Sequence, residues 1–499
     1  MDQREITMKC TARSFGVLLL VSVSVFAAQQ ASSQSAFKPD AALSEKDVAI
    51  LRSAKPFQDN NGDLPPPKEY SGPMFALNHA WPAQPLPPLA HTPWQAAINN
   101  GLINTKNAAA YADALKAAVT QNGRNLIMHY DSWDAAKAGW YNEPWLGTKR
   151  EAIHGTYSAG EFGPGIFPNT GLKAQFNTHV VTYYDARAAG ALRAVWGTTA
   201  MSPNVQTDTT QFTEGSIIVK AAVFASEDAN NLSNWWDAMS GAQLWKIYVP
   251  IGGVTPTPPP QVMPSYVAQF DIIVKDSQSA PKTGWVFMTL VYDKSAPGDI
   301  WDKMIPLGVQ WGNDPQATQA SMPLQENWIN PKAPLYSTET LGWGDRLSGP
   351  NDGARNDIAV NGQVMKNAPD SGCISCHSTS QWDVAKHKMV TFLLPSFSQA
   401  APPGFQTCGD TGKPDPNGNN ICSPAPSSTA WMKWFQDRPG TQPMDPGSVA
   451  TDFDEVFSFK SLPLWWAAVG PSNSSQDLMR LLPHGSRFNQ YNGAPLRKP

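Results

Sequence analysis

The segment SGCISCHSTSQW, at residues 371–382, has residue types and a spacing that indicate covalent chemistry. Two residues separate Cys373 from Cys376, and His377 follows at once. In an exported protein this C-x-x-C-H pattern is typical of haem attachment. The two thiols add to the vinyl groups of the porphyrin, and the histidine binds the iron. We therefore predict one covalent haem c, held by Cys373 and Cys376, with His377 as an iron ligand.

Three other interpretations of the two cysteines compete with haem attachment. A thioredoxin-like dithiol needs a strand-to-helix junction of a βαβ unit, which the preceding loop does not provide. A zinc site needs a second ligand pair at metal-binding spacing, whereas Cys408 and Cys422 are 14 residues apart. A disulfide between Cys373 and Cys376 would close a small, strained ring. Each of these alternatives fits the context less well than a haem does.

The N-terminus has the pattern of a secretory signal. Arg4, Lys9 and Arg13 precede the apolar run FGVLLLVSVSVFAA, and small residues follow at a cleavage position after residue 27. The run is short for a membrane-spanning helix, which needs about 20 apolar residues. A retained anchor is the alternative. We expect residues 1–27 to be a signal peptide and the mature protein to be periplasmic, without a membrane span.

The remaining cysteines and a repeated acidic pattern suggest two further features. Cys408 and Cys422 would be free to form a disulfide in an oxidising compartment. The loop between them contains Asp415, Asn417 and Asn419, which follow a D-x-N-x-N pattern that resembles part of a calcium loop. Residues 59–63 repeat this pattern, with Asp59, Asn61 and Asp63. Neither loop ends in the acidic residue that a complete calcium loop requires.

Bulk composition excludes one class of partner. The 37 basic and 41 acidic side chains give a net charge of -4, so we expect no nucleic-acid-binding surface. The chain is 41% hydrophobic, with 19 Trp, 20 Phe and 45 Pro, which indicates a folded protein with much irregular chain. The expected partners are a redox protein or a small-molecule electron donor or acceptor.

Four regions follow from local patterns. After the signal, residues 28–95 form a proline-rich wrapping segment that begins with a short helix capped by Ser44. Residues 96–330 form a domain of helices and an antiparallel sheet, and residues 331–499 contain the haem-attachment region and a C-terminal segment. The expected class is α+β, mainly β, with a central antiparallel sheet, a few short helices and long Pro/Gly-rich loops.

The expected elements are bounded by specific residues. Asn104 should begin one helix and Gly123 should end it, and a second helix within residues 183–197 should end at Gly197. Ser428 should cap a short helix near the C-terminus. Strands rich in β-branched and aromatic residues are expected at 215–225, 242–251, 266–276 and 285–293, with one more at 388–396.

Function depends on what binds the second face of the iron. A methionine or histidine there makes an electron carrier, whereas an open position makes a catalyst or sensor of small molecules. The sequence offers several candidate ligands and does not choose among them. It is also compatible with an iron that has no second protein ligand. They are His387, Met389, Met365, Met432 and Met444. Arg346, Asp352 and Arg355, just before the motif, could serve a distal pocket or the haem propionates, but we favour a solvated, turn-rich loop for them.

By its motif the chain resembles monohaem c-type cytochromes. The segments VVTYYDARAAGALRAVWG, FTEGSIIVKAAVF, GWVFMTLVYD and GCISCH also resemble a family of periplasmic cytochromes built on an antiparallel sheet. Some members of that family oxidise hydroxylamine with a lysine cross-linked to the haem, and others bind nitric oxide. The resemblance implies that Lys220 lies near the haem edge.

We predict a protein that transfers electrons through a single haem. The alternative is a haem enzyme or sensor with an open iron position, and the long loops available to wall a pocket favour it. As an enzyme it would be a haem-dependent oxidoreductase that acts on a small redox substrate.

Overall fold

The architecture is that of a computed structural model, which describes residues 45–162, 165–173, 176–226, 236–250, 259–352, 355–360, 363–369, 371–389, 406–407, 421–422 and 427–471. All of them belong to one unit, Ala36–Lys498. The predicted signal peptide, the Ser44 cap and most of the predicted strand at 388–396 lie outside these ranges. Among the described residues, no helix combines the length and the apolar character needed to cross a bilayer.

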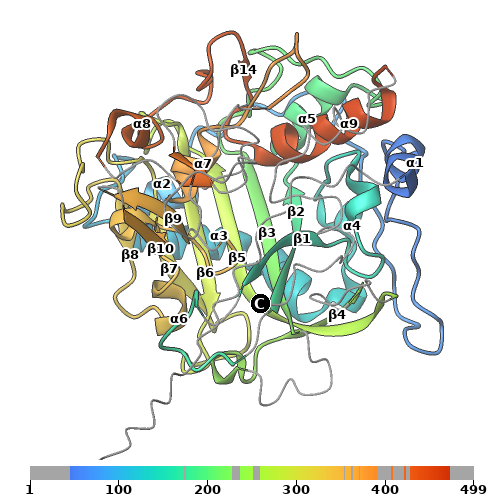
Figure 1. Ribbon diagram of the computed structural model, residues 1–499, viewed down its shortest axis with the longest axis horizontal. Helices are drawn as coiled ribbons and strands as arrows, with labels where there is room; N and C mark the ends of the chain where they lie inside the picture. Colours follow the sequence, from blue (N-terminus) through green and yellow to red (C-terminus); the bar gives the residue numbers. More distant parts are fainter. Residues whose placement is uncertain are drawn as a thin grey trace, which may run out of the picture. The chain divides into compact units, whose positions relative to one another are not determined.

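An antiparallel sheet of eight strands forms the centre of the fold (Figure 1). Its order is β1-β2-β3-β5-β6-β7-β8, and β4 pairs with part of β5. The strands are β1 (Tyr157–Phe162), β2 (Phe176–Tyr184), β3 (Ile217–Ser226), β4 (Leu244–Val249), β5 (Gln261–Lys275), β6 (Trp285–Tyr292), β7 (Met304–Gln310) and β8 (Asn327–Ile329). The described part of the chain therefore confirms the predicted class, a mainly β, α+β fold with a large antiparallel sheet.

Both faces of the sheet are covered, because successive side chains of a strand point to opposite sides. On one face, Val219 and Ala221 of β3 belong to a core shared with the long helix α3 (Ala108–Met128). On the other, Ile218 and Ala222 belong to a core shared with α5 (Ala188–Trp196) and α9 (Leu462–Val469). Since Lys220 has the same parity as Ile218, it lies on this second face.

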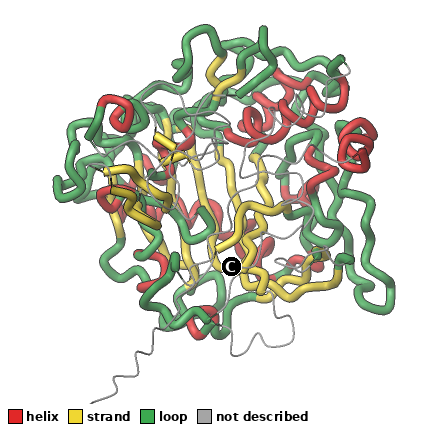
Figure 2. Tube along the Cα trace, viewed as in Figure 1, coloured by secondary structure: helices red, strands yellow, loops and turns green. Residues whose placement is uncertain are grey.

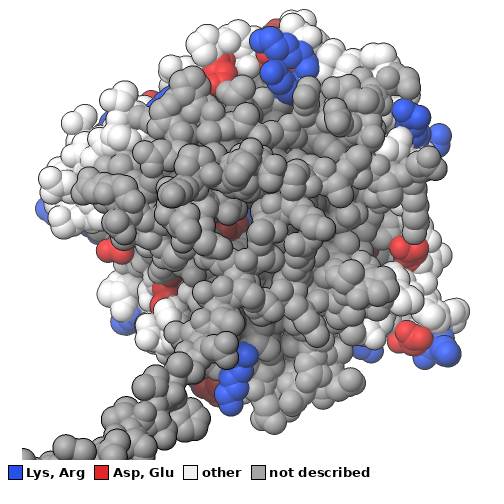
Figure 3. Space-filling view, viewed as in Figure 1, with Lys and Arg blue, Asp and Glu red and all other residues white. Residues whose placement is uncertain are grey.

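Short helices and small two-stranded ladders complete the fold, and loops connect most of them (Figure 2). The other helices are α1 (Glu45–Ser53), α2 (Pro93–Ala97), α4 (Ala135–Ala138), α6 (Leu335–Thr338), α7 (Cys373–His377) and α8 (Thr429–Met432), with a π-helical turn, η6 (Phe457–Ser461). The short 3-10 helices are η1 (Tyr130–Ser132), η2 (Leu146–Lys149), η4 (Asp237–Met239) and η5 (Trp343–Asp345). The ladders pair β9 (Arg355–Val360) with β10 (Gln363–Pro369), β11 (Gln381–Trp382) with β14 (Val449–Ala450), and β12 (Gln406–Thr407) with β13 (Ile421–Cys422). On the face in Figure 3, the described acidic and basic side chains lie interspersed.

The four strand predictions between residues 215 and 293 correspond to β3, β4, β5 and β6. The sequence did not reveal the flanking strands β1, β2, β7 and β8. β1 contains a glycine and an acidic residue, and β7 contains Pro306, so neither has the continuous β-branched pattern that marks a strand. The N-terminal part of the predicted helix at 183–197 is in fact the end of β2.

Two predicted helix ends are confirmed, and a third predicted helix was wrong in its boundaries. Ser428 caps α8, with its side chain accepting from the Trp431 N–H, and Gly197 ends α5 at a positive φ of 62°. The helix predicted between Asn104 and Gly123 instead spans Ala108–Met128. Gly123 lies inside this helix, and a Cβ at this position would collide with the ring of Trp301. The glycine therefore allows close packing against Trp301 and does not end the helix.

Candidate functional site

Backbone and side-chain hydrogen bonds fix the helix that contains the two cysteines. The Cys373 N–H donates to the Leu347 carbonyl at 2.8 Å, and the Ile374 N–H donates to Gln310 Oε1 of β7 at 3.1 Å. Ser375 Oγ accepts from the Gly372 N–H at 2.7 Å, and the Ile374 side chain is fully buried. The sheet and the loop before the motif therefore hold α7 in a defined orientation.

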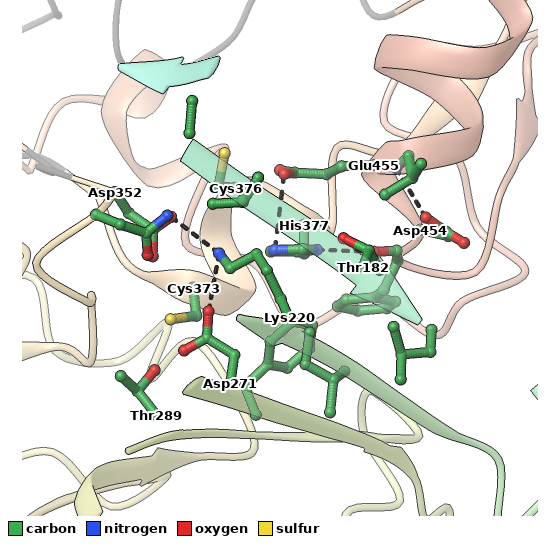
Figure 4. Close-up of a pocket in the computed structure, with 18 of the residues that line it drawn as sticks. Thr182, Lys220, Asp271, Thr289, Asp352, Cys373, Cys376, His377, Asp454 and Glu455 are labelled. Atoms are coloured by element: carbon green, nitrogen blue, oxygen red, sulfur yellow. Dashed lines mark hydrogen bonds and ion pairs between the residues drawn. The ribbon is translucent and has the colours of Figure 1, made fainter. Parts of the chain in front are cut away.

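A cavity of about 260 Å³ lies between α7, the sheet and the C-terminal segment (Figure 4). Both cysteines and His377 line it, together with apolar side chains of the sheet such as Ile218, Ile273 and Phe287. Its polar lining includes Tyr157, Thr182, Lys220, Asp271, Thr289, Asp352, Asp454, Glu455 and Lys460. The predicted haem-attachment residues thus face a partly open cavity with mostly apolar walls and several charged groups, which is the usual character of a cofactor site.

The two thiols have the properties of neutral side chains. Burial raises the pKa of Cys373 and of Cys376 well above the usual range, and nearby carboxylates add to the effect. Both are free, half-buried thiols, not a disulfide. Dithiol redox chemistry needs a thiolate, which forms where the pKa is lowered. Within the described ranges, no group of three or more His, Cys, Asp or Glu side chains is arranged to hold a metal ion by itself.

The imidazole of His377 has a defined tautomer. Its Nδ1 lies 2.8 Å from the carbonyl oxygen of Phe453, which can only accept, so Nδ1 carries the proton. Nε2 lies 3.6 Å from Glu455 Oε2, and the ring packs against Phe287 at a centroid distance of 4.7 Å. A backbone carbonyl that accepts from one ring nitrogen and so orients the other is the usual arrangement of a metal-binding histidine.

A cluster of three charged side chains stands in the same cavity. Lys220 of β3 and Asp271 of β5 are register partners, and Nζ lies 2.8 Å from Asp271 Oδ2 and 3.2 Å from Asp352 Oδ1. Burial by itself would lower the pKa of Lys220, but the two carboxylates outweigh it and raise that pKa well above the usual range. Lys220 is therefore an ammonium. Figure 4 shows its head reaching into the space between Cys373 and His377.

A second charged group comes from the C-terminal segment. Glu455 and Lys460 both line the cavity, and the i to i+5 bonding of the π-helical turn η6 favours bringing residues at this spacing onto one face. Burial lowers the pKa of Lys460 to about 8, and Glu455 opposes that shift. Burial raises the pKa of Asp454 to about 6, and the Tyr184 hydroxyl donates to this carboxyl at 2.9 Å.

The structure places Asp352 and Arg346, which precede the motif, in different environments. Asp352 reaches the cavity, which fits the pocket alternative and not the favoured solvated loop. Arg346 fits neither, because it is fully buried and does not line the cavity. Its guanidinium is fully buried, donates to the carbonyls of Trp343, Asn313 and Asp314, and lies between the rings of Trp343 and Phe435. The side chain of Arg355 lies outside the described residues.

None of the described candidates for a second axial ligand lines the cavity. His387 stacks on Trp466 at 3.5 Å, and Met389 packs with the core around α9. Met444 is buried and Met432 is half-buried, both away from the cavity lining. The side chain of Met365 lies outside the described residues. Met288, which was not a candidate, is the methionine among the described lining residues.

The other sequence features lie partly outside the described residues. Cys408 falls there, so the predicted disulfide with Cys422 remains a prediction, as does calcium binding by Asp415, Asn417 and Asn419. In the loop at 59–63, Asn61 Oδ1 accepts from the Asp63 N–H and Asp59 Oδ1 accepts from the Leu77 N–H. These oxygens stabilise the local turn and its contact with residue 77.

Several cavity residues were not predicted, chiefly Asp271, Asp454, Glu455 and Lys460. Asp271 had a detectable signal, because an acidic residue inside the apolar strand QFDIIVK is costly to bury without a partner. The residues at 454–460 had none, since more than 70 residues separate them from the motif and no local pattern links the two segments.

No family model, curated protein or solved structure matches the chain. The function must therefore be argued from the cavity itself.

Proposed function

We propose that the chain is a haem-dependent oxidoreductase that binds a small redox substrate in the cavity lined by Cys373, Cys376 and His377. The haem would be attached through the two thiols, with His377 Nε2 on the iron. Three observations support the fit of this group. Both thiols are neutral and reach the cavity, the Phe453 carbonyl orients His377 through Nδ1, and the walls beside them are mostly apolar.

The observation that favours an enzyme over an electron carrier is the lining of the cavity. The described candidates for a second axial ligand lie elsewhere, whereas Lys220, Asp271 and Asp352 put charged groups into the cavity. Burying charged groups costs free energy, so they call for a functional reason. A catalytic site uses such groups to bind a substrate and to transfer protons.

A bound haem would supply an iron that exchanges single electrons and can bind a small ligand directly. The protein's own residues would then hold the substrate and manage its protons. Lys220, as an ammonium, donates hydrogen bonds to a lone pair of the substrate. Asp271 is fixed as an acceptor by Lys220 and by the Gln269 amide at 2.9 Å. It therefore holds the orientation of Lys220.

Two further groups in the cavity can exchange protons. The side chain of Asp352 is 37% exposed while its Oδ1 contacts Lys220, so it links the charged cluster to solvent. Lys460, with a pKa of about 8, can hold or release a proton at Nζ near neutral pH. Proton transfer by a group whose pKa lies near the working pH is efficient.

Ligand binding by the purified, haem-loaded protein tests this proposal. The enzyme should show a high-spin ferric spectrum, and its ferrous form should bind carbon monoxide rapidly, with a shifted absorption band. A low-spin, six-coordinate spectrum that carbon monoxide leaves unchanged would favour the electron carrier instead. Substituting Lys220→Met should alter the affinity for the small ligand, whereas Lys294→Met, in an exposed ion pair with Asp237, should not.

A further inference from the structure

The carbonyl group that contacts His377 belongs to a strained turn. Asp452 and Phe453 have φ angles of 46° and 68°, so two consecutive non-glycine residues adopt the left-handed conformation. Side chains with a Cβ avoid this region, and such strain persists only where the surroundings hold it. The turn presents the Phe453 carbonyl to His377 Nδ1 at 2.8 Å.

The carboxylate of Asp452 anchors the turn to the sheet. Its side chain is fully buried, and it accepts from Lys275 Nζ at 2.6 Å and Trp285 Nε1 at 2.7 Å through Oδ1. Oδ2 accepts from the Phe212 N–H at 2.8 Å. Lys275 ends β5, Trp285 begins β6, and Phe212 precedes β3. Three donors from separate segments thus converge on one carboxylate.

A short ladder brings this turn to the motif. β14, just before Asp452, pairs with β11, just after the motif, and the Thr451 N–H donates to the Ser380 carbonyl at 3.1 Å. The ladder sets the two segments side by side. The anchoring of Asp452 then sets the direction of the next carbonyl.

We propose that Asp452 is a positioning residue for the iron ligand, acting through the Phe453 carbonyl on His377. The inference rests on the proposed function, in which His377 binds the haem iron. A hydrogen bond from Nδ1 fixes the tautomer and ring orientation of a ligating histidine and makes Nε2 a stronger donor to the metal. Asp452 controls whether that acceptor stays in place, although it contacts neither the haem nor the substrate.

The variant Asp452→Asn tests the inference, because an amide has one acceptor oxygen where three donors converge. Loss of a group that orients a metal ligand weakens metal binding 10- to 100-fold. Acid releases a histidine from iron by protonating it, so the same loss should move that release to higher pH by about 1 to 2 pH units. The iron–histidine stretching band of the ferrous protein should also shift to lower frequency.

Asp276→Asn is the matched control. Asp276 is also fully buried and accepts from two side chains, Gln95 Nε2 at 2.8 Å and Tyr111 OH at 2.7 Å, but it does not line the cavity. This variant should lose stability without moving the pH of histidine release. If Asp452→Asn does not fold, Lys275→Met removes one of the three donors and should produce a smaller shift in the same direction.

The possible results distinguish the role of Asp452 from the proposed haem site. A shift in Asp452→Asn with none in Asp276→Asn supports the inference. Unchanged histidine release in folded Asp452→Asn, or equal shifts in both variants, would overturn it while leaving the proposed haem site intact. Wild-type protein that contains no haem would contradict the proposed function and the inference together.

Discussion

Lys220 and Asp271 face each other across neighbouring central strands, with Nζ 2.8 Å from Oδ2, and both point to the side of the sheet that carries α7. The side chain of Lys220 is 18% exposed and that of Asp271 is 7% exposed. A charge pair at this depth is costly unless both partners are present. The sheet therefore keeps a polar group at a position where an apolar residue would pack more easily.

Lys220→Met should destabilise the protein strongly. It leaves the Asp271 carboxylate buried without its cation, which typically costs about 3 to 5 kcal/mol of unfolding free energy. Urea unfolding of the haem-free chain measures the change without any contribution from the haem. Lys294→Met, which removes an exposed pair with Asp237, should cost less than about 1 kcal/mol. Equal losses in the two variants would contradict the assignment of Lys220 to a buried cluster.

Arg346→Lys should also destabilise the fold, for a different reason. Lysine cannot reproduce the planar fork that donates to the carbonyls of Asn313, Asp314 and Trp343. We expect a loss of about 2 to 4 kcal/mol by urea unfolding, because buried carbonyls would lose their donors. Since Arg346 lies outside the cavity, the folded fraction should attach haem normally. A folded variant that attaches no haem would restore Arg346 as a pocket residue.

Substitutions at the predicted second axial ligands should leave the spectrum unchanged. His387→Gln, Met432→Leu and Met444→Leu remove groups that do not line the cavity. The absorption spectra of the ferric and ferrous haem protein should match those of the wild type in all three variants. Any one variant that converts a low-spin iron to a high-spin iron would identify a ligand and favour the electron carrier.

Stability should fall as the pH rises through the range where Asp185 titrates. Asp185 Oδ1 accepts from the Ala188 N–H at the start of α5, and burial raises its pKa from 3.8 to about 6. Between these two values the folded state binds the proton and the unfolded state does not. The free energy of unfolding from this group therefore decreases as pH rises from about 4 to about 6.

Asp185→Asn keeps the capping oxygen and removes the titration. Its free energy of unfolding should consequently depend less on pH between 4 and 6 than that of the wild type, and it should match or exceed the wild type at pH 7. Urea unfolding at a series of pH values provides the comparison. Parallel profiles for the two proteins would show that burial does not perturb this carboxyl.

Local patterns in the sequence were enough to predict the central strands. β3 and β6 are marked by β-branched and aromatic residues. The caps at Ser428 and Gly197 also depend only on neighbouring residues. Predictions of this kind succeed because their physical cause lies within a few residues.

The rest of the site depends on contacts between distant segments. The Phe453 carbonyl reaches His377 across 76 residues, and Asp452 meets Lys275 across 177 residues. Closeness in sequence can also mislead. Arg346 lies near the motif in the sequence, but its side chain does not line the cavity. Residues whose role is set by tertiary pairing carry no local signal in a single sequence.

We propose that Cys373, Cys376 and His377 hold a haem in the cavity. Mass spectrometry of the intact protein, purified from a bacterial periplasm that attaches haem to cysteines, decides whether they do. We predict a mass increment of one haem that survives denaturation, and its loss in the double variant Cys373→Ala/Cys376→Ala. Wild-type protein at the mass of the unmodified mature chain would contradict the claim.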